Sequence, residues 1–200
     1  MVKKLRTEYN GYRFRSRLEV RWAVFFDACG IRWEYEPEVI FHSDCTRYIP
    51  SFYLLDFHCF FDVQRKGVKG TKDGERAIRN ISYGQRNNEW AGIIAFGDPA
   101  DDDLYIFCQE SNDGSAGEYE NPVTIGFHPV THKLSLFAYS DRRDRCFYTA
   151  LDADAEIVPM ETYEYGKYEY DEFVNDRVLM ARRTARFFEF DDSQKGVRWK

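Results

Sequence analysis

The sequence predicts an α/β protein in which helices pack on a mixed sheet. Two observations lead to this fold class. Helical and strand periodicities follow one another along the chain in the order helix, strands, helix, strand, strand. The 200 residues are 44% hydrophobic and 18% aromatic, which is ample for a buried core and typical of globular chains.

The first expected element is a helix over residues 16–29. The letters SRLE at its start form a capping box, in which the Ser16 side chain accepts from the Glu19 amide and Glu19 reaches back. Gly30 supplies the C-terminal stop. Apolar residues recur at helical spacing through this segment: Leu18, Trp22, Phe25 and Cys29.

Strands are expected next. Residues 31–41, IRWEYEPEVIF, alternate as a strand that breaks at Pro37. A hairpin is then expected, with strands over 52–54 and 59–66 and a turn near Leu55-Asp56.

The next segment, TKDGERAIRNISYGQRNNE at 71–89, predicts a polar helix whose end is weakened by Gly84. WAGIIAF at 90–96 is typical of a buried strand and stops at Gly97-Asp98-Pro99. DLYIFCQ at 103–109 is its expected neighbour in the sheet.

A loop (SNDGSAGEYENP, 111–122), further short strands (123–150) and a last helix from about Asp171 to Phe188 complete the chain. These elements suggest three parts: a core over 1–115, a β-rich acidic extension over 116–170, and a basic C-terminal helix with its tail over 171–200, packed on the core.

The net charge of −6 hides an asymmetry. Residues 150–176 hold nine acids against the single Lys167, a net charge of −8, so the rest of the chain carries +2. A mildly basic body with an acidic appendage is compatible with nucleic-acid binding.

Composition also bears on localisation. No apolar run approaches the roughly 20 residues of a membrane helix. No apolar segment of the kind found in secretion signals follows the basic N-terminus. Five widely spaced cysteines without a C-x-x-C pattern favour reduced thiols. We therefore expect a cytoplasmic protein that is not embedded in a membrane.

Four stretches carry a resemblance to a known family: GYRFRSRLEVRWAVFFDACGIRWEYEPE, RYIPSFYL, FFDVQRKG and RVLMARRTARFFEF. Together they resemble the PD-(D/E)XK nuclease superfamily, and more narrowly a group common in bacteriophage and prophage genomes. The resemblance spans nearly the whole chain, and its N-terminal block is the specific part. It implies a restriction-endonuclease-like core and a metal-dependent hydrolytic site built from carboxylates.

The family's site carries over onto this chain with two of its four positions changed. The helix glutamate falls on Glu19, and the acid of the acid-x-Lys triplet falls on Asp62. The aspartate that follows the proline falls on Ser51, and the lysine falls on Gln64. The resemblance implies Mg²⁺ or Mn²⁺ as the cofactor, with Glu19 and Asp62 as its ligands if the site still takes a metal.

Alternative roles and substitutes remain open for these positions. Glu19 completes a capping box whatever else it does. Asp62 lies in an apolar strand, where a carboxylate costs free energy unless it is hydrated, paired or metal-bound. Lys66 shares strand parity with Asp62 and could replace the lost lysine, and His58 or Asp56 could supply a missing ligand.

Other candidate sites are weaker. His128 and His132 lie on a Pro-containing turn and lack the geometry of a helical zinc pair. Arg182 and Arg186, one helical turn apart, are candidate phosphate contacts; the alternative is a solvated face that pairs with neighbouring acids. The segment METYEYGKYEYDEF at 160–173 is either an exposed loop or a partner-binding surface.

Three functional hypotheses follow. The first, which we favour, is a phage-type nuclease-like protein with lost or weakened cleavage, binding nucleic acid, a nucleotide or a host defence protein in the bacterial cytoplasm. The second is an active divalent-metal-dependent endonuclease with a rearranged site. The third is an acidic inhibitor module whose 150–176 segment binds a basic protein. The first is favoured because an acidic ligand and the lysine of one catalytic unit are both replaced.

Overall fold

A nine-stranded mixed sheet organises the described part of the chain. This computed structural model describes residues 7–37, 40–41, 47–87, 92–110, 117–128, 131–140, 146–149, 157–158 and 174–190. The strand order is β13-β12-β11-β10-β9-β8-β7-β6-β3. The β7–β8 pair is parallel and the other neighbouring pairs are antiparallel. The expected mixed sheet with packed helices is confirmed, in a mixed α+β arrangement.

The described helices are α1 (Arg17–Cys29), α2 (Lys72–Asn87) and α3 (Asp176–Arg186). The strands of the large sheet are β3 (Trp33–Tyr35), β6 (Phe52–Leu54), β7 (Cys59–Gln64), β8 (Gly92–Phe96), β9 (Leu104–Glu110), β10 (Gly117–Phe127), β11 (Leu134–Ser140), β12 (Cys146–Thr149) and β13 (Ile157–Val158). Two smaller pairs are β1 (Glu8–Tyr9) with β2 (Tyr12–Arg13), and β4 (Ile40–Phe41) with β5 (Arg47–Tyr48).

Helix α1 begins and ends as its sequence predicts. The Ser16 side chain accepts from the Glu19 amide at 3.1 Å, and the Glu19 carboxylate accepts from the Ser16 amide at 2.9 Å, so both halves of the capping box form. Gly30 ends the helix with φ of 78°, a left-handed conformation that glycine adopts without steric cost. These two ends fix the extent of α1 and therefore the position of Glu19 in its first turn.

The hairpin expected within residues 51–66 forms from β6 and β7, with Phe52 opposite Phe61. Strand β7 ends at Gln64, two residues before the expected Lys66. Helix α2 then connects β7 to β8, which runs parallel to it, as parallel neighbours require a crossover connection. The expected pairing of the following strand with β8 is also present, as β9.

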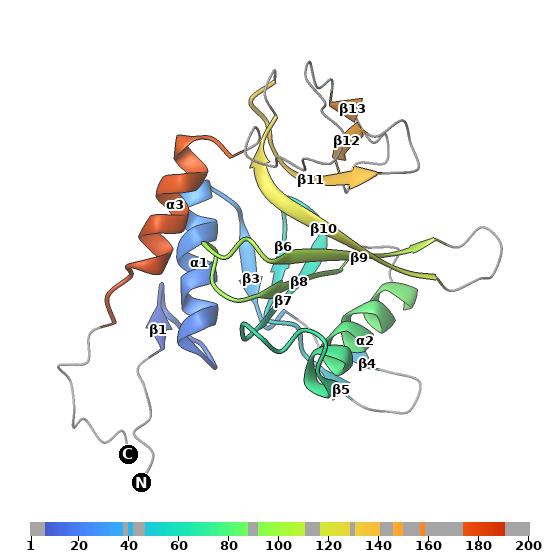
Figure 1. Cartoon of the computed structure of the whole chain (residues 1–200). Helices are drawn as coiled ribbons and strands as arrows, with labels where there is room; N and C mark the ends of the chain where they lie inside the picture. The colour runs from blue at the N-terminus through green and yellow to red at the C-terminus, as the bar shows by residue number, and fades with distance from the viewer. Residues whose placement is uncertain are drawn as a thin grey trace, which may run out of the picture.

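The helices cover both faces of the sheet, with α1 and α3 side by side on one face and α2 on the other (Figure 1). Alternation along β7 explains the two layers: Phe61 belongs to the larger core, which includes residues of α1 and α3. Phe60 belongs to a smaller core with Ala77 and Ile81 of α2. Asp62 has the parity of Phe60 and therefore lies toward the α2 face.

Two expected boundaries differ in the structure. Strand β10 begins at Gly117, inside the segment expected to be a loop, because residues 117–123 pair with β9. This pairing carries the sheet across the suggested division at residue 115. Helix α3 begins at Asp176, after an Asn175 cap, and not near the expected Asp171, whereas α2 covers most of the expected helix at 71–89 and continues past Gly84.

None of the helices in the described part of the chain combines the length and the apolar character that crossing a bilayer requires.

Candidate functional site

The fold brings together the four positions that the resemblance singles out. Glu19 lies in the first turn of α1, and Ser51 immediately precedes β6. The register that pairs Phe52 with Phe61 puts Ser51 opposite Asp62, and Gln64 follows two residues later with the same parity. Glu19, Ser51 and Asp62 are 4%, 0% and 3% exposed, so the cluster is buried.

Ser51 is the centre of this cluster. Its Oγ lies 3.2 Å from Glu19 Oε1 and 3.1 Å from Asp62 Oδ1, so its one hydroxyl hydrogen lies between two carboxylate acceptors. The same oxygen accepts from the Val63 amide at 3.2 Å. The Ser51 amide donates to Asp62 Oδ1 at 3.2 Å. A serine at this position therefore links the two acids and brings no charge of its own.

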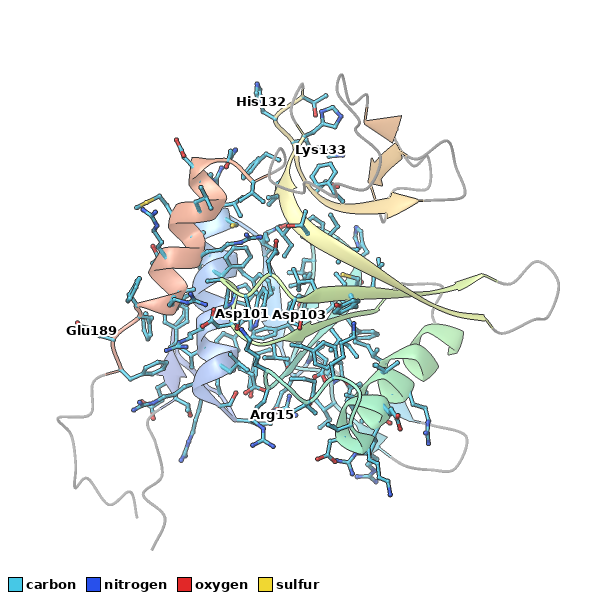
Figure 2. All side chains as sticks on the ribbon, viewed as in Figure 1. Arg15, Asp101, Asp103, His132, Lys133 and Glu189 are labelled. Carbon is cyan, nitrogen blue, oxygen red and sulfur yellow. The ribbon has the colours of Figure 1, made fainter. Side chains whose placement is uncertain are left out.

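Arg15 supplies the positive charge of the site. Its Nε lies 3.0 Å from Glu19 Oε1, and its Nη2 donates to Ser51 Oγ at 3.2 Å. Burial opposes the guanidinium charge, but Glu19 and the other acids nearby outweigh it and raise the Arg15 pKa above its ordinary value. Arg15 lies near the N-terminal end of α1 (Figure 2). Sequence reasoning missed this residue, which lies just before the Ser16 cap and outside the helix, and which the fold brings to Ser51.

Protein groups also donate to the outer oxygens of both carboxylates. Glu19 Oε2 accepts from the Ser16 amide at 2.9 Å and from the Tyr35 hydroxyl at 3.3 Å. Burial and the Glu19 charge raise the pKa of Tyr35 to about 12, so this hydroxyl keeps its proton near neutral pH. Asp62 Oδ2 accepts from Gln64 Nε2 at 2.7 Å.

Tyr48 lies close to Asp62. Burial raises the Tyr48 pKa well above its ordinary value, and the nearby Asp62 carboxylate raises it further. Its phenol therefore stays neutral beside the acid. The surroundings of Asp62 are arranged for a carboxylate that the protein itself solvates.

This donor set does not fit the divalent metal that the resemblance implies. Mg²⁺ and Mn²⁺ need several oxygen ligands with available lone pairs. Here each oxygen of Glu19 and Asp62 already accepts from a protein donor, and Arg15 carries the compensating charge. Within the ranges that the structure describes, no group of three or more His, Cys, Asp or Glu side chains is arranged to hold a metal ion.

The expected substitutes for the lost groups lie elsewhere. Lys66 Nζ contacts Asp101 Oδ1 at 2.7 Å, in the loop that follows β8. Asp56 forms a salt bridge with Arg32 at 2.6 Å, and His58 lies in the β6–β7 turn. Lys66 and Asp56 therefore pair with residues outside the Glu19–Asp62 cluster.

The two candidate phosphate contacts on α3 pair with the loop at residues 97–103. Arg182 forms a salt bridge with Asp102, and its side chain is only 13% exposed. Arg186 lies 3.0 Å from Asp98 and 3.4 Å from Asp101. Both arginines therefore attach α3 to this loop, whose Asp101 is labelled in Figure 2.

The remaining candidates fall into two groups. His128 and His132 share one turn, in which the His132 amide donates to the His128 carbonyl at 2.8 Å. The acidic 150–176 segment lies outside the described residues except for 157–158 and 174–176, and METYEYGKYEYDEF at 160–173 lies wholly outside them.

Asp101→Asn is expected to lower the free energy of unfolding by about 1–2 kcal/mol near neutral pH. Burial alone would raise the Asp101 pKa, but the hydrogen bonds from Lys66 and the Asp98 amide and the charge of Arg186 hold it below its ordinary value. A lowered native pKa stabilises the fold above the unfolded-state value and stops doing so as pH falls through the native value. The difference between wild type and variant should therefore shrink below about pH 4.

Urea unfolding at neutral and acidic pH would measure this difference. Asp103→Asn is the control, because it removes the same charge from the same loop, as Figure 2 shows. A pH-independent difference, or an equal loss in the control, would contradict the role given to Asp101.

Comparison with known proteins adds no relative: no protein-family model, no curated protein and no solved structure matches the chain.

Proposed function

We propose that this chain is a phage-type member of the PD-(D/E)XK nuclease superfamily that has lost metal-dependent cleavage and binds nucleic acid. The family part of the proposal is supported by the quoted stretches and by the meeting of Glu19, Ser51, Asp62 and Gln64 in one buried cluster. These are the four positions that the resemblance implies. One lies in α1, one immediately precedes β6, and two lie in β7.

One observation carries the loss of cleavage. The carboxylate oxygens of Glu19 and Asp62 accept from Arg15, Ser51, Gln64 and the neighbouring backbone. Phosphodiester hydrolysis in this superfamily needs a bound water whose pKa is lowered by a metal ion. The cluster instead holds a protein cation, an uncharged hydroxyl and an amide. The Ser51 hydroxyl is a poor replacement for the acid of the catalytic unit, and the Gln64 amide is a poor replacement for its lysine.

The binding part of the proposal is supported by charge next to the cluster. Residues 65–79, which follow β7 and enter α2, contain six basic and two acidic residues, a net charge of +4. The six basic side chains are exposed. A positive segment that begins directly after Gln64 suits a polyanion such as a nucleic-acid strand.

The cleavage test uses wild-type protein with single- and double-stranded DNA and RNA, in Mg²⁺ and in Mn²⁺. We expect no metal-dependent products, and we expect binding in fluorescence anisotropy that weakens as salt rises, with a slope of roughly −0.9 per phosphate contact on duplex DNA.

Two results would count against the proposal. Cleavage that disappears in Asp62→Ala would establish an active endonuclease with a rearranged site. The absence of nucleic-acid binding even at low salt would remove the binding function and favour a protein partner from the host.

A further inference from the structure

A polar pocket opens beside the Glu19–Asp62 cluster, on the α2 face of the sheet. It has a volume of about 290 Å³ and is lined chiefly by Tyr48, Gln64, Arg65, Asp73, Arg76 and Asn80. Gln64 belongs to both places: its amide donates to Asp62 inside the cluster, and its side chain lines the pocket. A ligand in the pocket would therefore lie directly next to the altered site.

The loop that forms one wall of the pocket is held in place by its own hydrogen bonds. The Val68 amide donates to the Arg65 carbonyl at 3.2 Å, and the Val68 carbonyl accepts from the Thr71 amide at 3.0 Å and from the Thr71 hydroxyl at 2.6 Å. Thr71 also leads into α2, where the Glu75 amide donates to its carbonyl at 2.9 Å. These bonds fix the backbone that carries Arg65.

Gly74 lets this loop lie close against α2. A Cβ at Gly74 would lie 2.4 Å from the Val68 carbonyl oxygen, a distance that any other residue could reach only by moving the loop backbone. The wall of the pocket is therefore formed before any ligand arrives, which lowers the entropic cost of binding.

The pocket offers hydrogen-bond donors and positive charge. Arg65 and Arg76 contribute two guanidinium groups, and Gln64 and Asn80 contribute amides. Arg76 Nη2 lies 3.2 Å from Asp73 Oδ1, which orients the guanidinium and leaves its other N–H groups available. The first turns of α2 add the positive end of a 16-residue helix.

Two other basic residues of the segment are engaged elsewhere. Lys66 pairs with Asp101, and the Lys69 ammonium lies 3.2 Å from the centre of the Tyr105 ring. The two arginines therefore provide the positive side chains that line this pocket. Their planar, multiply donating groups suit phosphate oxygens, to which arginine donates two parallel hydrogen bonds.

We propose that this pocket binds one phosphate group of a nucleic-acid strand, through Arg65 and Arg76. The proposal rests on the nucleic-acid binding proposed above and adds the place where the strand is held. The strand then passes beside Asp62, held by its backbone without being cut.

The experiment compares Arg65→Ala and Arg76→Ala with Arg79→Ala in the full chain. Arg79 is exposed on α2, the helix that carries Arg76, but it does not line the pocket. Its replacement therefore removes the same charge without touching the site. Anisotropy with a labelled oligonucleotide should show about tenfold weaker binding for each pocket variant and less than about threefold for the control. Each pocket variant should also reduce the salt slope by about one.

A second measurement separates this inference from the proposed function. Titration of wild type with inorganic phosphate, followed by NMR of the arginine Nε–H groups, should shift the signals of Arg65 and Arg76 but not that of Arg79. Oligonucleotide binding that all three variants weaken equally, with no phosphate-induced shift, would overturn the pocket while leaving nucleic-acid binding intact.

Two further outcomes also distinguish the pocket proposal from the proposed binding function. Phosphate shifts without oligonucleotide binding would support a phosphate site but overturn the nucleic-acid strand as its ligand, and with it the proposed binding function. Absence of both would overturn both proposals.

Discussion

Replacing Arg15 with methionine is expected to lower the free energy of unfolding by about 2–3 kcal/mol. Methionine retains an unbranched apolar stem but cannot donate to Glu19 Oε1 or Ser51 Oγ. Glu19 and Asp62 are almost wholly buried and would be left without a cation beside them. The loss stays below that of a fully buried pair because the Arg15 side chain is 47% exposed.

Urea unfolding near neutral pH measures this change, with Arg13→Met as the matched control. Arg13 lies in β2 and is exposed, so its replacement should alter stability by no more than about 0.5 kcal/mol. Added salt should leave most of the difference in place, because charges in a buried cluster are screened less than surface charges. Equal stability of the two variants would show that the carboxylates do not depend on Arg15.

The features that sequence reasoning predicted well are those determined by neighbouring residues. The SRLE capping box and Gly30 define α1 through contacts within a few residues of each end. The β6–β7 hairpin follows from alternation and a short turn. Once these were expected, the resemblance was enough to predict that Glu19 and Asp62 would lie together.

The features that sequence reasoning missed depend on contacts between distant parts of the chain. Arg15 donates to Ser51, 36 residues away, and Lys66 pairs with Asp101, 35 residues away. Nothing local distinguishes such a cation from one that meets phosphate. The first part of β10, residues 117–122, was missed for a related reason: Pro122 weakens strand propensity, yet pairing with β9 places it opposite Tyr105 inside the sheet.

The substitution with the largest expected effect is Ser51→Asp combined with Gln64→Lys. Aspartate at position 51 would place a third carboxylate where the serine oxygen now lies, 3.2 Å from Glu19 and 3.1 Å from Asp62. Arg15 alone cannot balance three buried acids, so Ser51→Asp by itself should cost about 3–5 kcal/mol of stability. Lysine at position 64 would return the missing cation to the strand face of Asp62, where Gln64 now donates its amide.

Three carboxylates around one point form an oxygen ligand set of the kind that Mg²⁺ and Mn²⁺ bind. We therefore expect Mn²⁺ to raise the melting temperature of the Ser51→Asp, Gln64→Lys variant while leaving wild type unchanged, because a ligand that binds only the folded state stabilises it. Metal-dependent cleavage of DNA or RNA should appear in the same variant. Asp62→Ala in that background should abolish both effects.

Ser51→Asn with Gln64→Lys is the control that separates charge from size. Asparagine has nearly the volume of aspartate, so the control should share any cost of crowding in this buried position, about 1–3 kcal/mol, but should not respond to Mn²⁺. A Mn²⁺ response in the aspartate variant alone would mean that one missing carboxylate separates this cluster from a metal site. No response in either variant would mean that the Arg15 network, rather than the loss of an acid at position 51, excludes the metal, because the carboxylates would then still be held by their protein donors.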